Sequence, residues 1–512
     1  MRVGLRQRTH PIRPSHRRVS IDPGQAGRHG GRTAQGTAPS ATARPPQRQC
    51  RPAARAGQLR QAQQHPGGDQ DLPDRPNHTG RQRNFARIPG NSAHGQPGIG
   101  IDLRGHTRDA SAGARAGFHR SGRLPLSRSA MTSRPEYTPE HHQFRQLVRD
   151  FVHRIVVPAH EPGERRGQWD RALFTEAARL GLLGFSVPER FGGPGVNDFR
   201  YNAIVIDELQ RAGAASEAIA FTLQNDVVLP YLTDLTTLEQ QQRWLPGVVT
   251  GDTVLGIAMT EPGAGSDLAG IHTTAVRDGS HYVVNGAKTF ISNGQSGDLF
   301  VIAVRTSPER HQGLSLLVVD ATTPGFHRGR SLEKIGLHAQ DTSELSFTDM
   351  RVPVENLLQN EGMGFYQLMR NLPQERLALA VGAVAAAEGI LAETLDYVRQ
   401  RKAFGSPIAS FQHSQFLLAE LATEIDIART YLDDCLAQHL AGELTAARAA
   451  RLKWWTTELQ VRTADRCLQL HGGYGYMREY RVSQAFVDAR IQTIYGGTNE
   501  IMKTIIAKDL GI

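Results

Sequence analysis

Two glycine-rich stretches of the sequence could bind a ligand through their backbone. The stretch IYGGTNE, residues 494–500, places Gly496 and Gly497 directly before Thr498, a residue type that caps helix N-termini. Glycines remove side chains and allow the backbone to approach a flat or phosphorylated group closely. No acid or base stands at the two glycine positions. Any catalytic group must therefore come from another part of the chain.

The second stretch is AMTEPGAGSDLAG, residues 258–270, which combines glycines with hydroxyl groups. Gly263 and Gly265 leave backbone N–H groups open beside the hydroxyls of Thr260 and Ser266. This combination suits the polar edge of a heterocycle, or phosphate and carbonyl oxygens. An ordinary turn at the end of a strand is the alternative, and a bare GxG would favour it.

Three regions with different hydrophobic periods must position these stretches. Residues 139–246 place apolar residues three and four apart, as helices do. Residues 251–354 change to a period of two, with Gly, Asn, Asp and Pro between short runs, which predicts a compact antiparallel β unit. From about residue 362 the pattern is helical again, in long segments with short connections. These favour an antiparallel bundle, and Glu388 interrupts the apolar stripe of its first helix.

The charge of the chain is divided unevenly along its length. The chain has 512 residues and a net charge of +9, but residues 1–130 hold 23 Arg and 6 Asp with no Lys or Glu, so the rest carries −8. The front segment shows no apolar periodicity and is predicted to be disordered. A nucleic-acid-binding tail and a transit peptide fit it poorly, because it lacks Lys and is too long for a simple leader. We favour an extension of the gene model, with translation beginning at Met131.

Cysteine content and hydropathy limit the remaining classes of function. The chain has three cysteines, Cys50, Cys435 and Cys467, and no CxxC, which indicates a reducing compartment and no metal site. The longest apolar run, residues 377–387, is too short to span a bilayer. We therefore expect neither a metal, nor a membrane span, nor nucleic acid as a partner.

Five motifs together carry a family resemblance. They are AMTEPGAGSDLAG, FISNG at 290–294, RQRKAFG at 399–405, QLHGGYG at 469–475 and IYGGTNEIM at 494–502, in this order. The combination resembles the flavin-dependent acyl-CoA dehydrogenases over residues 135–512. The resemblance implies an α+β, mainly α fold: a helical domain (131–255), a β-barrel-like domain (256–361) and a four-helix bundle (362–512). It also implies a homotetramer, a dimer of dimers, that binds FAD without a Rossmann GxGxxG.

The resemblance also implies which residues bind FAD. Thr260 and Ser292 would donate to the polar edge of the flavin ring, and Phe290 stands where many members carry Trp. Arg401 would cross a dimer interface to the neighbour's pyrophosphate; a cation that stabilises a helix end is its alternative. The full implied set is Ile257, Met259, Thr260, Gly265, Ser266, Phe290, Ile291, Ser292, Arg401, Phe404, Gln412, Gln469, Leu470, His471, Gly472, Gly473, Thr498, Asn499 and Glu500.

The family resemblance also implies which residue is the catalytic base. Many members carry their glutamate where this chain has Gly496, whereas the long-chain and isovaleryl branches present it from the first bundle helix. The stretch LPQERLAL, residues 372–379, resembles that second version, which implies Glu375 as the base and the Gly496 N–H as a donor to the thioester carbonyl. The alternative for Glu375 is a solvated acid in the first turn of a helix. The implied substrate contacts are Ser266, Tyr366, Gln374, Arg376 and Gly497.

The function implied by the resemblance is the dehydrogenation of an acyl-CoA to a trans-2-enoyl-CoA. The motifs resemble the long-chain branch most, with an electron-transfer flavoprotein as acceptor and a cytoplasmic or, in a eukaryote, mitochondrial matrix location. Branched-chain, isoprenoid or sterol side-chain acyl-CoAs are alternative substrates. An acyl-CoA oxidase and a non-catalytic subunit are alternative functions, and the presence of both Glu375 and Arg401 disfavours the latter.

Overall fold

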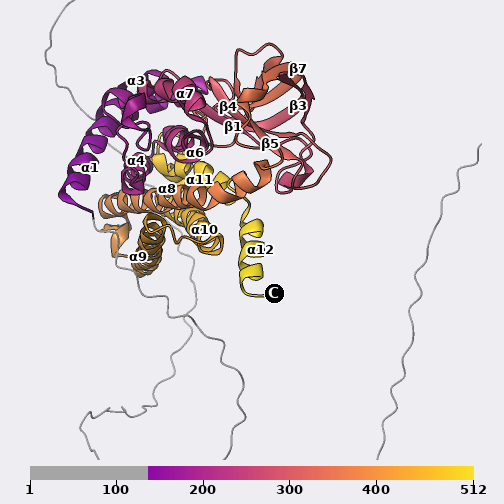
Figure 1. Ribbon diagram of the computed structural model, residues 1–512. Coiled ribbons are helices and arrows are strands. Elements are labelled where there is room, and N and C mark those ends of the chain that lie inside the picture. The colour runs from indigo at the N-terminus through magenta and orange to yellow at the C-terminus, as the bar shows by residue number, and fades with distance from the viewer. Residues whose placement is uncertain (1–136) are drawn as a thin grey trace, which may run out of the picture. The chain divides into compact units, whose positions relative to one another are not determined.

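The computed structural model describes residues 137–512, so the front segment 1–130 and its predicted disorder lie outside the described residues. The described part runs from helices through strands to helices again, as the sequence predicts (Figure 1). Its N-terminal helices are α1 (Pro139–Phe151), α2 (Val157–Arg166), α3 (Ala172–Arg179), α4 (Phe199–Arg211), α5 (Ala215–Thr222), α6 (Leu229–Asp234) and α7 (Leu238–Thr250), with π-helical segments at Val152–Val156 and Leu223–Val228.

Local sequence signals explain the ends of these helices. The hydroxyl of Thr237 accepts from the backbone N–H of Gln240, and the Gln240 side chain accepts from the backbone N–H of Thr237, a capping box that begins α7. The helix ends at Gly251, whose φ of 76° suits glycine. The chain then enters the β unit at strand β1 (Leu255–Ala258).

The β unit is a seven-stranded sheet in which β4 has three partners. Its order is β1-β4-β2-β3-β7-β6, and β5 pairs with the other side of β4. The β1–β4 pairing is parallel and β2 meets β4 in one parallel pair, so the expectation of an antiparallel unit was wrong for these strands. The remaining pairs are antiparallel. The strands are β1 (Leu255–Ala258), β2 (Thr274–Asp278), β3 (His281–Ser292), β4 (Leu299–Arg305), β5 (Leu314–Asp320), β6 (Phe326–Ser331) and β7 (Thr342–Pro353).

Strands β4 and β5 are buried on both faces, which holds the sheet against the helices. Leu299, Val301 and Ala303 of β4 pack into a core shared with α6 and α7, while Phe300 and Ile302 pack into the interior of the β unit. This alternation follows from the period of two along a strand. The β unit therefore shares one of its two apolar faces with the N-terminal helices.

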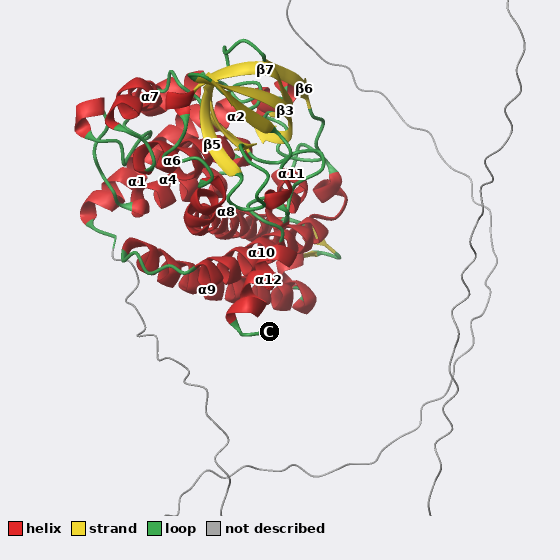
Figure 2. Ribbon diagram, turned by 45° about the vertical axis from the view of Figure 1, so that its right-hand side comes forward, coloured by secondary structure: helices red, strands yellow, loops and turns green. Residues whose placement is uncertain are grey.

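The C-terminal region is built around one long helix. Helix α8 (Gly364–Gln400) contacts α4, α9, α10 and β5, and it lies between the sheet and the outer helices (Figure 2). Among the described residues it alone is long and apolar enough to cross a membrane, and 72% of its most apolar window is buried inside the protein, as in a core helix. The other elements here are α9 (Gln412–Leu440), α10 (Ala446–His471), α11 (Arg481–Ala489), α12 (Asn499–Asp509) and the short strands β8 (Lys402–Ala403) and β9 (Ser406–Pro407).

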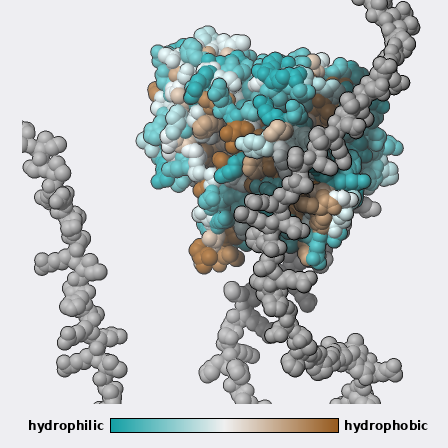
Figure 3. All heavy atoms as spheres, turned by 180° about the vertical axis from the view of Figure 1, so that it is seen from behind, coloured by the Kyte–Doolittle hydropathy of each residue, from teal (hydrophilic) through white to brown (hydrophobic). Residues whose placement is uncertain are grey.

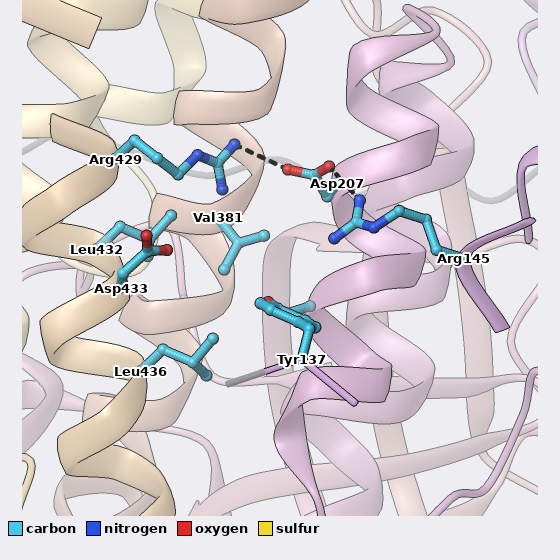
Figure 4. Close-up of a pocket in the computed structure, with 9 residues that line it drawn as sticks. Tyr137, Arg145, Asp207, Val381, Arg429, Leu432, Asp433 and Leu436 are labelled. Carbon is cyan, nitrogen blue, oxygen red and sulfur yellow. Dashed lines mark hydrogen bonds and ion pairs between the residues drawn. The ribbon is translucent and has the colours of Figure 1, made fainter. Parts of the chain in front are cut away.

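An ionic network joins the N-terminal helices to the bundle. Asp207 of α4 lies between the guanidinium groups of Arg145 and Arg429, at 2.8 Å from each (Figure 4). Arg429 also binds Glu388 of α8 at 2.7 Å, which explains the acid that interrupts the apolar stripe. Burial opposes the ionisation of Asp207, but the neighbouring arginines keep its pKa below the ordinary value. This network fixes α4 against α8 and α9.

Candidate active site

Glu375 is buried in the N-terminal third of α8 and faces the N-terminal helices. Its side chain is 5% exposed, and the hydroxyl of Tyr231 in α6 donates to its Oε1 at 3.1 Å. Because α8 begins at Gly364, the alternative of a solvated acid in the first helical turn is wrong. The buried phenol that holds Glu375 has no signal in the sequence, since an aromatic residue in a short helix is typical of a core.

Burial raises the pKa of Glu375 to about 7, against the opposing effects of the Tyr231 hydroxyl and the Arg376 charge. A carboxyl group with this pKa exchanges a proton readily near neutral pH, as a general base requires. The environment therefore gives Glu375 the property that proton abstraction from a weak carbon acid needs.

The glycine pair of IYGGTNE lies beside the same face of α8. A Cβ atom at Gly496 would lie 2.4 Å from Cδ1 of Leu379, which stands four residues after Glu375 and so on the same side of the helix. Gly496 and Gly497 have φ values of 64° and 94°. As predicted, Thr498 then caps α12, its Oγ1 accepting from the N–H of Ile501 at 3.3 Å.

Two buried basic side chains hold the carbonyl groups of the glycine pair. Arg376 Nε donates to the Gly496 carbonyl at 3.2 Å, and Lys453 Nζ of α10 donates to the Gly497 carbonyl at 2.8 Å. Lys453 also donates to Oδ1 of Asn499 at 3.1 Å. The sequence analysis missed Lys453, although a lysine between Leu452 and Trp454 on an apolar helical face is a detectable signal.

The other predicted substrate contacts have different surroundings. Gln374 Nε2 donates to the carbonyl of Asp226 at 2.9 Å, and Tyr366 is 46% exposed near the start of α8. Ser266 is exposed in the loop after β1. The structure thus brings Glu375, Arg376 and the glycine pair together, whereas it leaves Tyr366 and Ser266 at the surface.

The two segments predicted to contact the flavin ring lie side by side. The backbone N–H of Thr289 in β3 donates to the Thr260 carbonyl at 2.9 Å, which places Met259 and Thr260 next to residues 290–292. Phe290 is 67% exposed and has a φ of 58°, a conformation that non-glycine residues rarely adopt. An exposed aromatic ring held in this way offers a flat apolar surface, while Ile291 beside it is buried.

The buried Lys288 holds this region through hydrogen bonds. Lys288 Nζ donates to the carbonyl of Met259 at 3.1 Å and to Oε1 of Glu261 at 2.8 Å. The carboxylate of Glu261 also accepts from the backbone N–H groups of His272 at 2.6 Å and Thr273 at 2.9 Å. These contacts fix the start of the glycine-rich loop, in which the positions of Gly263 and Gly265 have open space beside them.

The RQRKAFG and QLHGGYG motifs meet at a surface depression of about 470 Å³. Its lining includes most of the residues predicted to bind the neighbour's FAD. A Cβ at Gly472 or Gly473 would meet nothing within 4 Å, and the Arg401 guanidinium lies 5.4 Å from the centre of the Tyr474 ring. The predicted residues in this lining are Arg401, Gln469, Leu470, His471, Gly472 and Gly473.

The other predicted FAD contacts differ from one another in burial and position. The ring of His471 is buried, stacks on Tyr397 at 4.0 Å between ring centres and bonds to the Cys467 carbonyl through Nδ1, so it is held by the protein. Phe404 is 99% exposed and Gln412 begins α9, both outside the lining. Asn499 is buried against Lys453, and Glu500 is exposed.

These features fit FAD and give no sign of a metal centre. Open glycine backbone, the exposed Phe290 ring and the Arg401 guanidinium suit a flat ring and a pyrophosphate. Within residues 137–512, no group of three or more His, Cys, Asp or Glu side chains could hold a metal ion. The fold and the site define a three-part enzyme with a buried glutamate and surfaces for a large planar, phosphorylated cofactor.

Comparison with known proteins identifies the family. The N-terminal, middle and C-terminal domain models of the acyl-CoA dehydrogenases match residues 138–252, 256–350 and 362–511. The chain therefore belongs to the acyl-CoA dehydrogenase family, and it is an oxidoreductase that acts on the CH–CH group. The predicted family and fold class are confirmed.

Individual relatives match over the same part of the chain. The mitochondrial long-chain specific acyl-CoA dehydrogenase of Rattus norvegicus is 45% identical over 377 residues, 73% of this chain and 87% of the relative. The crystal structure of an acyl-CoA dehydrogenase from Geobacillus kaustophilus is 48% identical, covers 74% of this chain and all of its own, and has a TM-score of 0.73. A glutaryl-CoA dehydrogenase from Mycobacterium smegmatis in complex with FADH2 is 26% identical over 73% of this chain and 95% of its own, with a TM-score of 0.69.

Proposed function

We propose that this protein is an FAD-dependent acyl-CoA dehydrogenase of fatty-acid β-oxidation that acts on medium- or long-chain thioesters, with Glu375 as its base. The observation that carries the proposal is the buried Glu375 of α8 beside a glycine pair that offers no acid of its own. The 45% identity to a long-chain specific relative supports the choice of chain length.

The residues around Glu375 perform the proton-transfer part of the reaction. The α-hydrogen of a thioester is a very weak acid, so the carbonyl oxygen must be stabilised while negative charge develops on it. The Gly496 N–H supplies a donor for that oxygen, and the Glu375 carboxylate takes the proton and becomes a neutral acid. When FAD is bound, it accepts the hydride that leaves the β-carbon. The product is a trans-2-enoyl-CoA.

Three groups of residues would hold the cofactor. Thr260, Ser292 and the Phe290 ring would meet the flavin ring, and Gly263 and Gly265 would leave room for its approach. The depression beside Arg401 would receive the pyrophosphate and adenosine of the neighbouring subunit's FAD. The chain's own residues thus bind and orient the cofactor at two separate surfaces.

Because Arg401 would bind the FAD of a neighbouring subunit, this arrangement requires an oligomer. We propose a homotetramer, as the family resemblance implies. Exposed apolar side chains in the C-terminal region support it, and Figure 3 shows apolar residues gathered among hydrophilic ones on one face. The exposed apolar side chains of the C-terminal region include Phe404, Phe416, Ile427, Tyr476, Leu510 and Ile512. An electron-transfer flavoprotein remains the proposed acceptor, and the mitochondrial location of several relatives supports a matrix location if the source is a eukaryote.

Anaerobic titration with acyl-CoAs of graded chain length tests the proposal through the absorbance of the flavin. We expect long chains to bleach the wild type, and Glu375→Gln to lower the rate by about 10²–10⁴-fold because it cannot take a proton. Glu393→Gln, on the same helix but beside Arg481, is the matched control and keeps the native rate. If the flavin of Glu375→Gln is bleached at the native rate, Glu375 is not the base. If no acyl-CoA bleaches the flavin of the wild-type protein, the proposed function is wrong.

A further inference from the structure

The two basic side chains that hold the glycine pair are buried without a carboxylate in hydrogen-bond contact. Lys453 is 0% and Arg376 is 4% exposed, and within residues 137–512 neither forms an ion pair with an acid. Burial and the neighbouring Arg376 charge lower the pKa of Lys453 to about 7, and a buried amine in either protonation state is costly unless its hydrogen bonds are made. Here those bonds go to the Gly496 and Gly497 carbonyls and to Asn499.

A glycine pair cannot hold its own conformation. Glycine loses more backbone freedom on folding than any other residue, and both φ values of this pair are positive. Leu379 and Met502 wall the pair, since Cβ atoms at Gly496 and Gly497 would lie 2.4 and 2.7 Å from them. Apolar walls limit the space but leave the orientation of the peptide groups free. Orientation requires hydrogen bonds at fixed angles.

The amine of Lys453 is itself held in place. Its second acceptor, Asn499 Oδ1, lies at the start of α12 and also accepts from the Thr457 hydroxyl at 3.3 Å. Lys453 and Thr457 stand four residues apart on α10, hence on one face of that helix. The contacts from α10 and α8 therefore fix two successive peptide groups of the loop from two directions.

We propose that Lys453, together with Arg376, is a positioning residue: by holding the carbonyls of Gly496 and Gly497 it fixes the backbone conformation of the pair and thereby keeps the preceding Gly496 N–H aimed at the substrate's thioester oxygen. The inference rests on the proposed function, because it assigns a task to the carbonyl-binding loop of that reaction. Lys453 does not touch the reacting atoms. It acts through the orientation of the loop: the Gly496 N–H belongs to the planar peptide group just before the two that are held, so its direction follows from the backbone dihedral angles that they impose at Gly496.

The test measures carbonyl polarisation separately from hydride transfer. A 3-oxoacyl-CoA carries an acidic α-hydrogen between two carbonyl groups, so it binds and ionises without reducing the flavin, and its enolate gives a long-wavelength absorption band with the oxidised flavin. The pH at which this band appears reports the apparent pKa of the bound ligand. For Lys453→Met we expect this pKa to rise by about one unit and kcat to fall about tenfold or more, with KM and FAD content little changed.

Three further variants complete the test. Lys453→Arg keeps a donor and should recover part of both losses, while Lys503→Met removes an exposed lysine of α12 and should change neither. Asn499→Asp places a carboxylate beside Nζ that competes with the Gly497 carbonyl, so a smaller shift in the same direction is expected even if Lys453→Met fails to fold.

The inference is overturned if Lys453→Met keeps the native pKa of the bound ligand and the native kcat. It is also overturned if a folded Asn499→Asp shows no shift in the pKa of the bound ligand. Failure of the proposed function is distinguishable, because wild-type protein would then neither bleach with acyl-CoA nor develop the long-wavelength band.

Discussion

Two glycine pairs in the C-terminal region show opposite environments. Gly472 and Gly473 follow α10 at a surface depression, where added Cβ atoms would meet nothing within 4 Å. Gly496 and Gly497 are walled by Leu379 and Met502, and their carbonyls are held by the buried side chains of Arg376 and Lys453. The sequence presents both as similar Gly-Gly motifs.

The difference shows two uses of glycine at a ligand site. At the first pair the missing side chains leave an open surface, where a ligand can approach the backbone. At the second pair they allow the backbone to pack against α8 in a conformation that side chains disfavour, so that one N–H points in a fixed direction. Substitutions at the open pair should therefore affect the binding of the ligand, whereas substitutions at the held pair should affect the reaction rate.

The largest effect is expected at Gly496. Gly496→Val places a β-branched residue at a φ of 64° and a Cβ against Leu379, which should displace the loop and lower the rate of flavin reduction about a hundredfold or more. Anaerobic stopped-flow absorbance measures this rate. Gly473→Ala is the comparison variant: its added Cβ meets nothing within 4 Å, so it should keep the native melting temperature and, in protein with FAD bound, the native rate of flavin reduction. Equal losses in the two variants would contradict the distinction between the pairs.

The second expected effect is a pH-dependent change in stability at Glu375. The carboxyl ionises at its ordinary pKa of 4.5 in the unfolded chain and at about 7 when folded, so the unfolded chain releases the proton first and stability falls as pH rises through this window. Glu375→Gln removes the loss, and its stability gain should grow from near zero at pH 4.5 to at most about 3 kcal/mol above pH 7. Thermal unfolding of both proteins across this range measures the gain. A gain that does not depend on pH would contradict the buried, titrating acid.

The third effect is expected beside the open glycine pair. Arg401→Ala should weaken FAD binding about tenfold to a hundredfold, because a guanidinium bonded to phosphate contributes roughly 1.5–3 kcal/mol. Flavin retained after dialysis measures this. Since Arg401 is exposed, the melting temperature of the cofactor-free protein should not change. Native FAD retention would remove the depression from the proposed cofactor site.

The smallest effect is expected at Tyr231. Its hydroxyl donates to the Glu375 carboxylate and lowers its pKa, as the Arg376 charge also does, so Tyr231→Phe should raise the pH midpoint of flavin reduction by about one unit or less. The maximal rate at high pH should stay near the native value. A midpoint that moves downward would show that the hydroxyl does not stabilise the ionised form.

Much of the fold follows from local sequence signals. The period of two in β4 and β5, the capping box at Thr237 and the Thr498 cap each depend on residues close together in the chain. The parallel β1–β4 pairing could not be predicted, because both pairing directions satisfy the same alternation of apolar residues.

The candidate site also has features that the sequence determined and features that only the tertiary structure decided. The sequence by itself determined the family through its ordered motifs, and with it Glu375 and Arg401, because each motif is a continuous run of residues. Tertiary structure decided that Glu375 is buried under Tyr231 and that Arg376 and Lys453 hold the glycine carbonyls. These contacts join α6, α8, α10 and the loop before α12, whose packing depends on the whole core. A pKa or a peptide orientation set by such packing cannot be read from a single segment.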